Sequence, residues 1–454
     1  MIAYLYLTIC VISVFYLIIK KPEYILFLFI IIYNFGDFII AKSNQDLFSF
    51  YPFFIQLLLF FSIILYGFIN HKIDIIFFNR YTLLIFITVI YLAFLALMNG
   101  TDPVDYFIDY RRNLSNMLII PFILSMKINH EFLYRMIKFL LYILIFNIII
   151  AFIQNFGGPA VYDFFSPKVF FTRYGTSFSF TNTLMEQSKL IKGTFLRMNE
   201  LGNYVALLSI IIAGTYKYLD IRIITFKKLL LLLIFSGLTI IFTGNRISLI
   251  CFMVGLFLIF SLKNYKYILS SLFLLILIVV SYAFILQSLQ QFVNSFYLTN
   301  TPIGRISFIL NADQDSLLFN STLYLSYTLI PFFIKNLFFG AGLLYQGGYG
   351  LVNIHNNNTT DATLILYLAE FGIIGFFIFI SPIINLLIVQ YRLKYAKYFR
   401  LSFILFIAII VQMVTDAGLF YKVNNFILFA FMSVLFVISR EKKFKNKKIS
   451  KLLI

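Results

Sequence analysis

The chain has 454 residues, of which 61% are hydrophobic and only 12% are charged, and its formal net charge is +18. Soluble domains carry about 25% charged residues, so this composition excludes a chain that hides its apolar residues in soluble cores, and it also excludes an intrinsically disordered chain. We expect lipid to surround the protein and no nucleic acid to bind it, because the only dense basic run is the tail from Arg440 to Lys451.

Long apolar stretches follow one another along the whole chain. A bilayer core takes about 20 helical residues, so each stretch of this length is a candidate transmembrane helix. The sequence therefore predicts an all-α membrane protein, a polytopic bundle of about 13 transmembrane helices (range about 12–14) that forms a single integral membrane domain over residues 1–454. In chain order the predicted spans are 2–19, 24–41, 51–69, 81–98, 113–126, 136–155, 199–216, 228–243, 246–262, 266–286, 361–389, 401–420 and 424–439.

The Lys and Arg residues predict the direction in which the spans run. With the basic tail, residues 440–454, in the cytoplasm and the spans alternating, about two thirds of all Lys and Arg residues fall on the cytoplasmic side. Two long loops then lie on the outer face, at residues 156–198 and 287–360. Residues 316–334 are apolar too, but Pro331 breaks them and a further span would move the tail outside. We therefore expect helices at the membrane interface there.

Three acidic residues fall inside predicted spans, where a charge is costly: Asp37, Glu370 and Asp416. We expect each of them to lie near a helix end or to meet a partner within the bundle. Asp361 and Glu370 are two and a half helical turns apart, so we expect them to face opposite sides of one helix and to form no carboxylate pair.

Two arginines of the outer face stand apart from the other cations. Arg246 lies alone between two spans, at the end of the sequence Thr-Gly-Asn-Arg, and Arg305 lies in the second long loop. The planar fork of Arg binds phosphate or carboxylate through two hydrogen bonds. An Arg between apolar helices also needs an anionic partner more than a solvated Lys does. Both residues are therefore candidates for holding a phosphorylated substrate.

A polar string follows His355 on the outer face. It runs from Asn356 to Asp361, immediately before an apolar helix. Its Thr and Asp side chains suit a helix cap, and they equally suit a polar site for sugar hydroxyls in which His355 or Asp361 is the base. The sequence contains no phosphate-cradling loop, no paired-histidine zinc motif and no nucleophile elbow, so we expect no cofactor, no metal and no ATP hydrolysis.

Three stretches carry motifs that are similar to those of one family. The motifs have the same order along the chain and lie on the same predicted side of the membrane as in that family. Residues 193–203 have the pattern Gly-x-Phe-x-x-x-Asn-x-x-Gly at the entry to a span, and the turn 243–248, Thr-Gly-Asn-Arg-Ile-Ser, is similar to a Thr-x-Ser-Arg-Thr turn. The third stretch combines Lys335-Asn336 and Gly340-Ala341-Gly342 with Leu-Ala-Glu-Phe-Gly-Ile-Ile-Gly at 368–375. Together with the span layout, these stretches resemble the O-antigen polymerase and ligase superfamily of bacterial inner-membrane enzymes.

The third stretch departs from the ligase pattern of that superfamily. Ligases carry His followed by Asn, Ser or Gln, then nine residues, then Gly-x-x-Gly. Counting back from Gly372 places Asp361 and Ala362 at the positions of that pair, and His355 lies six residues too early. The departure favours the polymerase branch, and it leaves Asp361 and His355 as alternative bases.

The resemblance implies glycosyl transfer at the periplasmic face of the inner membrane, with the carboxyl terminus in the cytoplasm. A polymerase would join oligosaccharide repeat units that are linked to undecaprenyl pyrophosphate. The alternatives are an O-antigen ligase, which transfers glycan to lipid A core, and, in a different class, a flippase for lipid-linked oligosaccharides. The partners implied are the lipid-linked glycan donor and acceptor, anionic inner-membrane lipids and a chain-length regulator.

The resemblance also implies roles for individual residues. The pyrophosphate would be bound by arginines at the bilayer edge, the acceptor proton would pass to a carboxylate or an imidazole, and asparagines would give polar support. The candidates for binding pyrophosphate are Arg246, Arg305 and Arg197. The candidate base is Asp361 or His355, and the candidates for polar support are Asn199, Asn203 and Asn356.

Overall fold

The protein is an all-α, multi-pass membrane protein, as predicted. Nine helices in the described part of the chain are long and apolar enough to cross a membrane. The only strands there form one small β-hairpin. The computed structural model describes residues 2–43, 45–98, 114–165, 170–173, 176–179, 191–195, 198–261, 334, 337–340, 363–393, 396–415 and 422–452.

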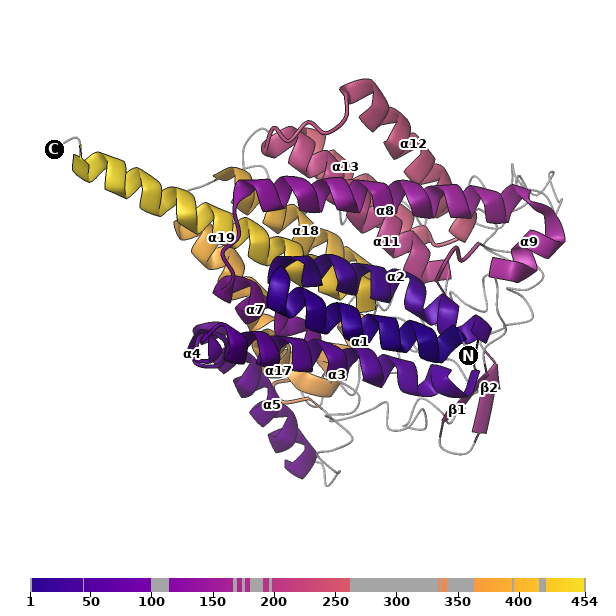
Figure 1. Ribbon diagram of the computed structural model, residues 1–454, viewed down its shortest axis with the longest axis horizontal. Helices are drawn as coiled ribbons and strands as arrows, with labels where there is room; N and C mark the ends of the chain where they lie inside the picture. Colours follow the sequence, from indigo (N-terminus) through magenta and orange to yellow (C-terminus); the bar gives the residue numbers. More distant parts are fainter. Residues whose placement is uncertain are drawn as a thin grey trace.

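The elements are labelled in Figure 1. Where the structure describes the chain without a gap, short turns or short helices join consecutive long helices. In chain order they are α1 Ile2–Lys20, a 3₁₀ turn Pro22–Tyr24, α2 Ile25–Ser43, α3 Gln45–Ile69, α4 Ile73–Phe77, α5 Arg80–Met98, α7 Ile119–Ser125, α8 His130–Phe156, α9 Gly158–Phe165, β1 Phe170–Arg173, β2 Thr176–Ser179, α11 Met198–Tyr218, α12 Phe226–Thr243, α13 Arg246–Ser261, α17 Thr363–Arg392, α18 Ala396–Thr415 and α19 Lys422–Leu452.

Short polar signals set where the apolar helices begin and end. The Asn129 side chain accepts a hydrogen bond from the N–H of Phe132 at 2.9 Å and so caps the start of α8. Asn79 caps α5 in the same way, because its Oδ1 accepts from the N–H of Tyr81 at 2.8 Å. α12 ends before Gly244, whose φ of 70° is the left-handed conformation that glycine adopts without strain.

The two termini lie at opposite ends of the bundle (Figure 1). α9 and the β1–β2 hairpin lie at the end where α1 begins, and the last turns of α19 project from the other end. We refer to these as the hairpin end and the tail end. α2, α8, α12 and α18 run toward the hairpin end, whereas α11, α13 and α19 run away from it. The hairpin end is therefore where the starts of α11 and α13 meet the ends of α8, α12 and α18.

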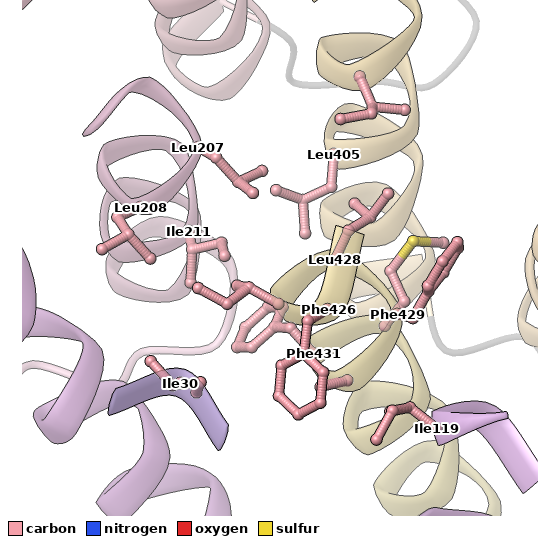
Figure 2. Packing of buried hydrophobic residues seen from close by; sticks show 14 of the residues in the cluster. Ile30, Ile119, Leu207, Leu208, Ile211, Leu405, Phe426, Leu428, Phe429 and Phe431 are labelled. Carbon is pink, nitrogen blue, oxygen red and sulfur yellow. The ribbon is translucent and has the colours of Figure 1, made fainter. Parts of the chain in front are cut away.

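α11 is the centre of the bundle. Every residue from Leu201 to Ala213 is buried, because α11 packs against neighbours on all sides, including α8, α12, α13 and α18. Figure 2 shows Leu207 and Ile211 of α11 close to Leu405 of α18 and Leu428 of α19. By contrast, α1 and α5 expose many large apolar side chains, which is the pattern of helices that face lipid.

Several predicted spans differ from the helices. The predicted span 136–155 starts too late, because the Asn129 cap lets α8 begin at His130. The predicted span 113–126 corresponds to the apolar helical segment Leu114–Ser125, which includes α7 and is shorter than the about 20 residues that a bilayer core takes. The predicted span 361–389 corresponds to α17, but α17 is broken at Gly372, and the sequence did not predict this break.

Other predictions fall partly or wholly outside the described residues. The predicted span 266–286 lies there entirely, and the interfacial segment 316–334 does so except for Ile334, so the total of 13 spans stays a prediction. The first long loop, 156–198, contains α9 and the antiparallel hairpin, in which Phe170 lies opposite Ser179. Neither element was predicted from the sequence.

Candidate functional site

The structure places part of the predicted site at the hairpin end. Asn199 and Asn203 lie in the first turns of α11, and Arg246 is the first residue of α13. The described part of the structure does not include the Arg246 side chain, nor Arg197, Arg305, His355, Asn356 and Asp361.

The turn between α12 and α13 fixes the backbone of Arg246. Thr243 Oγ1 accepts a hydrogen bond from the N–H of Asn245 at 3.3 Å, and the left-handed Gly244 reverses the chain. Asn245 Oδ1 in turn accepts from the N–H of Ser248 at 3.1 Å and so caps α13. The hydrogen bonds at the end of α12 and at the start of α13 therefore fix where the Arg246 backbone lies.

Polar contacts tie this turn to α11 and α18. The Ser248 hydroxyl donates to Asn203 Oδ1 at 2.7 Å, and Asn245 Nδ2 donates to the Asn199 carbonyl oxygen at 3.4 Å. Gln412 of α18 donates to the Asn203 carbonyl oxygen at 3.4 Å. Asn203 is fully buried, so its side chain holds α11 against α13, whereas Asn199 is half-buried. Asn203 supports the site from within the bundle.

Gly202 allows α11 and α13 to approach so closely. A β-carbon at this position would lie 2.7 Å from Ser248 Oγ and 2.9 Å from Thr243 Oγ1. We expect Gly202→Ala to push the two helices apart and to lower the free energy of unfolding by about 1–3 kcal/mol. Thermal melting of the purified protein in detergent would measure this loss. A melting temperature equal to that of the wild type would contradict it.

A short non-helical segment before α11 is held by two amide side chains of α8. Gln154 Oε1 accepts hydrogen bonds from the N–H groups of Lys192, at 2.9 Å, and Gly193, at 2.8 Å. Asn147 Oδ1 accepts from the Thr194 hydroxyl at 3.2 Å. The end of the first long loop is thus anchored inside the bundle, next to the start of α11.

The break in α17 is filled by a turn from the second long loop. Gly372 has φ 65° and ψ −176°, a conformation that is essentially restricted to glycine. The carbonyl oxygens of Leu337 and Phe338 accept hydrogen bonds from the N–H groups of Ile373, at 2.9 Å, and Ile374, at 3.1 Å. The backbone groups that the break exposes are therefore satisfied by the inserted turn.

Tyr91 of α5 joins the turn to the broken helix. Its hydroxyl donates to the carbonyl oxygens of Phe371, at 2.8 Å, and Phe339, at 3.1 Å. A β-carbon on Gly340 would lie 2.2 Å from a backbone oxygen of α17, and one on Gly375 would lie 2.2 Å from Tyr91 Cε1. Gly340 and Gly375 of the third motif thus serve close packing. We refer to the break, the turn 337–340 and Tyr91 as the Gly372 junction.

Two acidic side chains are buried in this part of the bundle. Glu370 precedes the break and is fully buried, and Glu200 in the first turn of α11 is also buried. The part of α17 before the break begins at Thr363. The predicted base Asp361 therefore precedes this helix by two residues in the chain. Within the described residues, no group of three His, Cys, Asp or Glu side chains is placed to hold a metal ion.

Three residues of this region were not predicted. Asn147 and Gln154 lie within the predicted span 136–155, where a buried amide is costly unless it is hydrogen-bonded, so the sequence did contain a signal for them. Tyr91 gave no such signal, because tyrosines are frequent in membrane proteins, and the partners of its hydroxyl come from distant parts of the chain.

A comparison with protein families supports the resemblance drawn from the motifs. Residues 231–380 match the family model described as O-antigen ligase. The matched region includes the α12–α13 turn and the Gly372 junction, apart from Tyr91. A comparison with curated proteins found no match. The match confirms the similarity to the O-antigen polymerase and ligase superfamily over about a third of the chain, and it does not separate polymerases from ligases.

Proposed function

From the match of residues 231–380 to the O-antigen ligase family, we propose that the protein is a glycosyltransferase that polymerises surface polysaccharide. It joins oligosaccharide repeat units carried on undecaprenyl pyrophosphate at the periplasmic face of the inner membrane. The observation that carries the proposal is this match, which covers the turn that holds Arg246 and the glycines of the third motif. The polymerase is favoured over the ligase because Asp361 and Ala362 occupy the positions of the ligase His pair.

The reaction needs positioning and charge neutralisation more than an activated cofactor. The acceptor hydroxyl oxygen attacks C1 of the donor sugar, the C1–O bond to pyrophosphate breaks with its electron pair, and the acceptor proton passes to a base. Pyrophosphate is already a good leaving group, and holding two lipid-tethered substrates in line can lower the barrier by about 7–11 kcal/mol. Cations preorganised near the leaving group would stabilise the charge that develops on it.

The described residues fit such a site in two ways. Half-buried Asn199 has an uncharged amide side chain, a group suited to sugar hydroxyls, and its carbonyl oxygen accepts from Asn245 Nδ2 in the turn before α13. The capped turn fixes Arg246 at the same end. We assign pyrophosphate binding to Arg246, Arg305 and Arg197, the base to Asp361 or His355, and polar support to Asn199, Asn203 and Asn356.

The glycan ladder of a deletion strain tests the proposal against the ligase alternative. If the gene encodes the polymerase, its deletion is expected to leave lipid A core that carries single repeat units, because the ligase still transfers them. Complementation with the wild-type gene should restore the ladder. Core without any repeat unit would instead identify the protein as a ligase, and an unchanged ladder would contradict both functions.

A further inference from the structure

The segment 191–195 is built into the bundle although it has no helical structure. Ile191, Thr194 and Phe195 are buried, and the Phe195 ring packs against Tyr204 of α11 with ring centroids 5.1 Å apart. The N–H of Ile191 donates to the carbonyl oxygen of Phe242 at the end of α12, at 3.3 Å. The segment is therefore held between α11 and α12, at the end of the bundle where Arg246 begins α13.

One oxygen atom controls the backbone around Lys192. Gln154 Oε1 accepts from the N–H groups of both Lys192 and Gly193, which belong to the two peptide groups on either side of the Lys192 Cα. The Lys192 carbonyl oxygen accepts from the N–H of Phe195 at 3.0 Å. Because both peptide planes are fixed, the direction in which the Lys192 side chain leaves the backbone is fixed as well.

Gln154 is itself held in a buried environment next to a second amide. It is 1% exposed, and Asn147, two turns earlier on α8, links the same segment to α2. Asn147 Oδ1 accepts from the Thr194 hydroxyl, while its Nδ2 donates to Asn34 Oδ1 at 3.2 Å. Lys192, by contrast, is only half-buried. The positively charged Lys192 therefore has a fixed backbone and lies at the edge of the region that contains the buried amides of Gln154 and Asn147.

We infer that Lys192 is a further cation for the pyrophosphate of the lipid-linked substrate and that Gln154 is its positioning residue. The inference rests on the proposed function and extends its anion-binding site to a lysine of the segment 191–195, whose backbone is held by α8. Because the backbone that carries the Lys192 side chain is fixed, its ammonium group needs less reorganisation when charge develops on the leaving group than that of a lysine on a moving backbone.

The test uses the full-length protein in lipid nanodiscs, with inorganic pyrophosphate as a competitor of the lipid-linked donor. Gln154→Leu removes the oxygen that accepts from the N–H groups of Lys192 and Gly193. Asn155→Leu is the matched control, because Asn155 is the next residue, is buried, and has no hydrogen-bond partner for either amide atom among the described residues. Removing an unpaired buried amide is expected to be neutral or stabilising.

The expected results separate positioning from general stability. Gln154→Leu should raise the inhibition constant of pyrophosphate and lower kcat/KM for the donor by about tenfold, while Asn155→Leu leaves both unchanged. Lys192→Gln should match Gln154→Leu. In the Lys192→Gln background, Gln154→Leu should add less than about twofold, because both changes remove the same contact.

Three outcomes would overturn the inference. One is equal behaviour of Gln154→Leu and Asn155→Leu, and another is full additivity with Lys192→Gln. The third is an unchanged inhibition constant in Lys192→Gln, a variant that keeps the buried contacts even if Gln154→Leu does not fold. Failure of the proposed function is recognised separately, because folded wild-type protein would then transfer no glycan.

Discussion

Arg246→Ala abolishes long-chain glycan in cells and leaves the amount of protein in the membrane unchanged: this is the largest effect on activity that we expect. The hydrogen bonds that hold the turn around the Arg246 backbone come from Thr243 and Asn245, so we expect them to remain in this variant. Losing one preorganised donor to a developing anion lowers turnover on the order of 100- to 1,000-fold. We expect the same of Arg305→Ala, because Arg305 is another of the three arginines assigned to the pyrophosphate.

Glycan ladders together with immunoblots of the membrane fraction measure this effect. Arg222→Ala is the control, because Arg222 is exposed in the turn between α11 and α12 at the tail end. Arg246→Lys keeps the charge but loses the two-pronged geometry, so we expect a short and faint ladder from it. Full-length ladders from both Arg246→Ala and Arg305→Ala would rule out the anion-binding role.

Gly372→Ala is expected to prevent the protein from folding or to leave it with a much lower melting temperature. The φ and ψ of Gly372 lie in a region that costs a residue with a β-carbon about 1–3 kcal/mol. That β-carbon would also lie 2.4 Å from the Phe338 carbonyl oxygen and 2.5 Å from the Gly340 nitrogen. Both atoms belong to backbone, which cannot move aside without losing the hydrogen bonds of the Gly372 junction.

Size-exclusion profiles and thermal melting in detergent measure this change. The matched control is Gly237→Ala within α12, where the nearest atom to the new β-carbon is Phe252 Cε1 at 3.5 Å, an ordinary contact. Ala is favoured over Gly inside a helix by about 1 kcal/mol, so the control should melt at the wild-type temperature or above it. Equal melting of both variants would show that the break does not require glycine.

The long apolar stretches of the sequence predicted most of the described helices. A transmembrane helix forms all its backbone hydrogen bonds within one continuous segment, so its signal lies in one stretch of sequence. The ends of the helices were less certain, since a single cap decides them, as Asn129 does for α8. The break at Gly372 could not be read from the sequence. It depends on the turn 337–340 and on Tyr91, which approach α17 only in three dimensions.

The candidate site was predictable only in part for the same reason. The motif 193–203 identified Asn199 and Asn203, yet the buried position of Asn203 follows from its contact with Ser248 across two helices. Gln154 accepts hydrogen bonds from the backbone of Lys192 and Gly193, which come almost forty positions later in the chain. Arg197, Arg305, His355, Asn356 and Asp361 keep the roles that the resemblance implies, as proposals that mutation tests.

α19 offers a practical consequence for imaging this protein. Its 31 residues form one helix of about 46 Å, while a hydrocarbon core is about 30 Å thick. The last turns therefore stand clear of the bundle, as Figure 1 shows. A helical fiducial fused in phase with α19 would share its axis without a loop between them. Such a fusion would give a small membrane protein a rigid external landmark for aligning particles by electron cryomicroscopy.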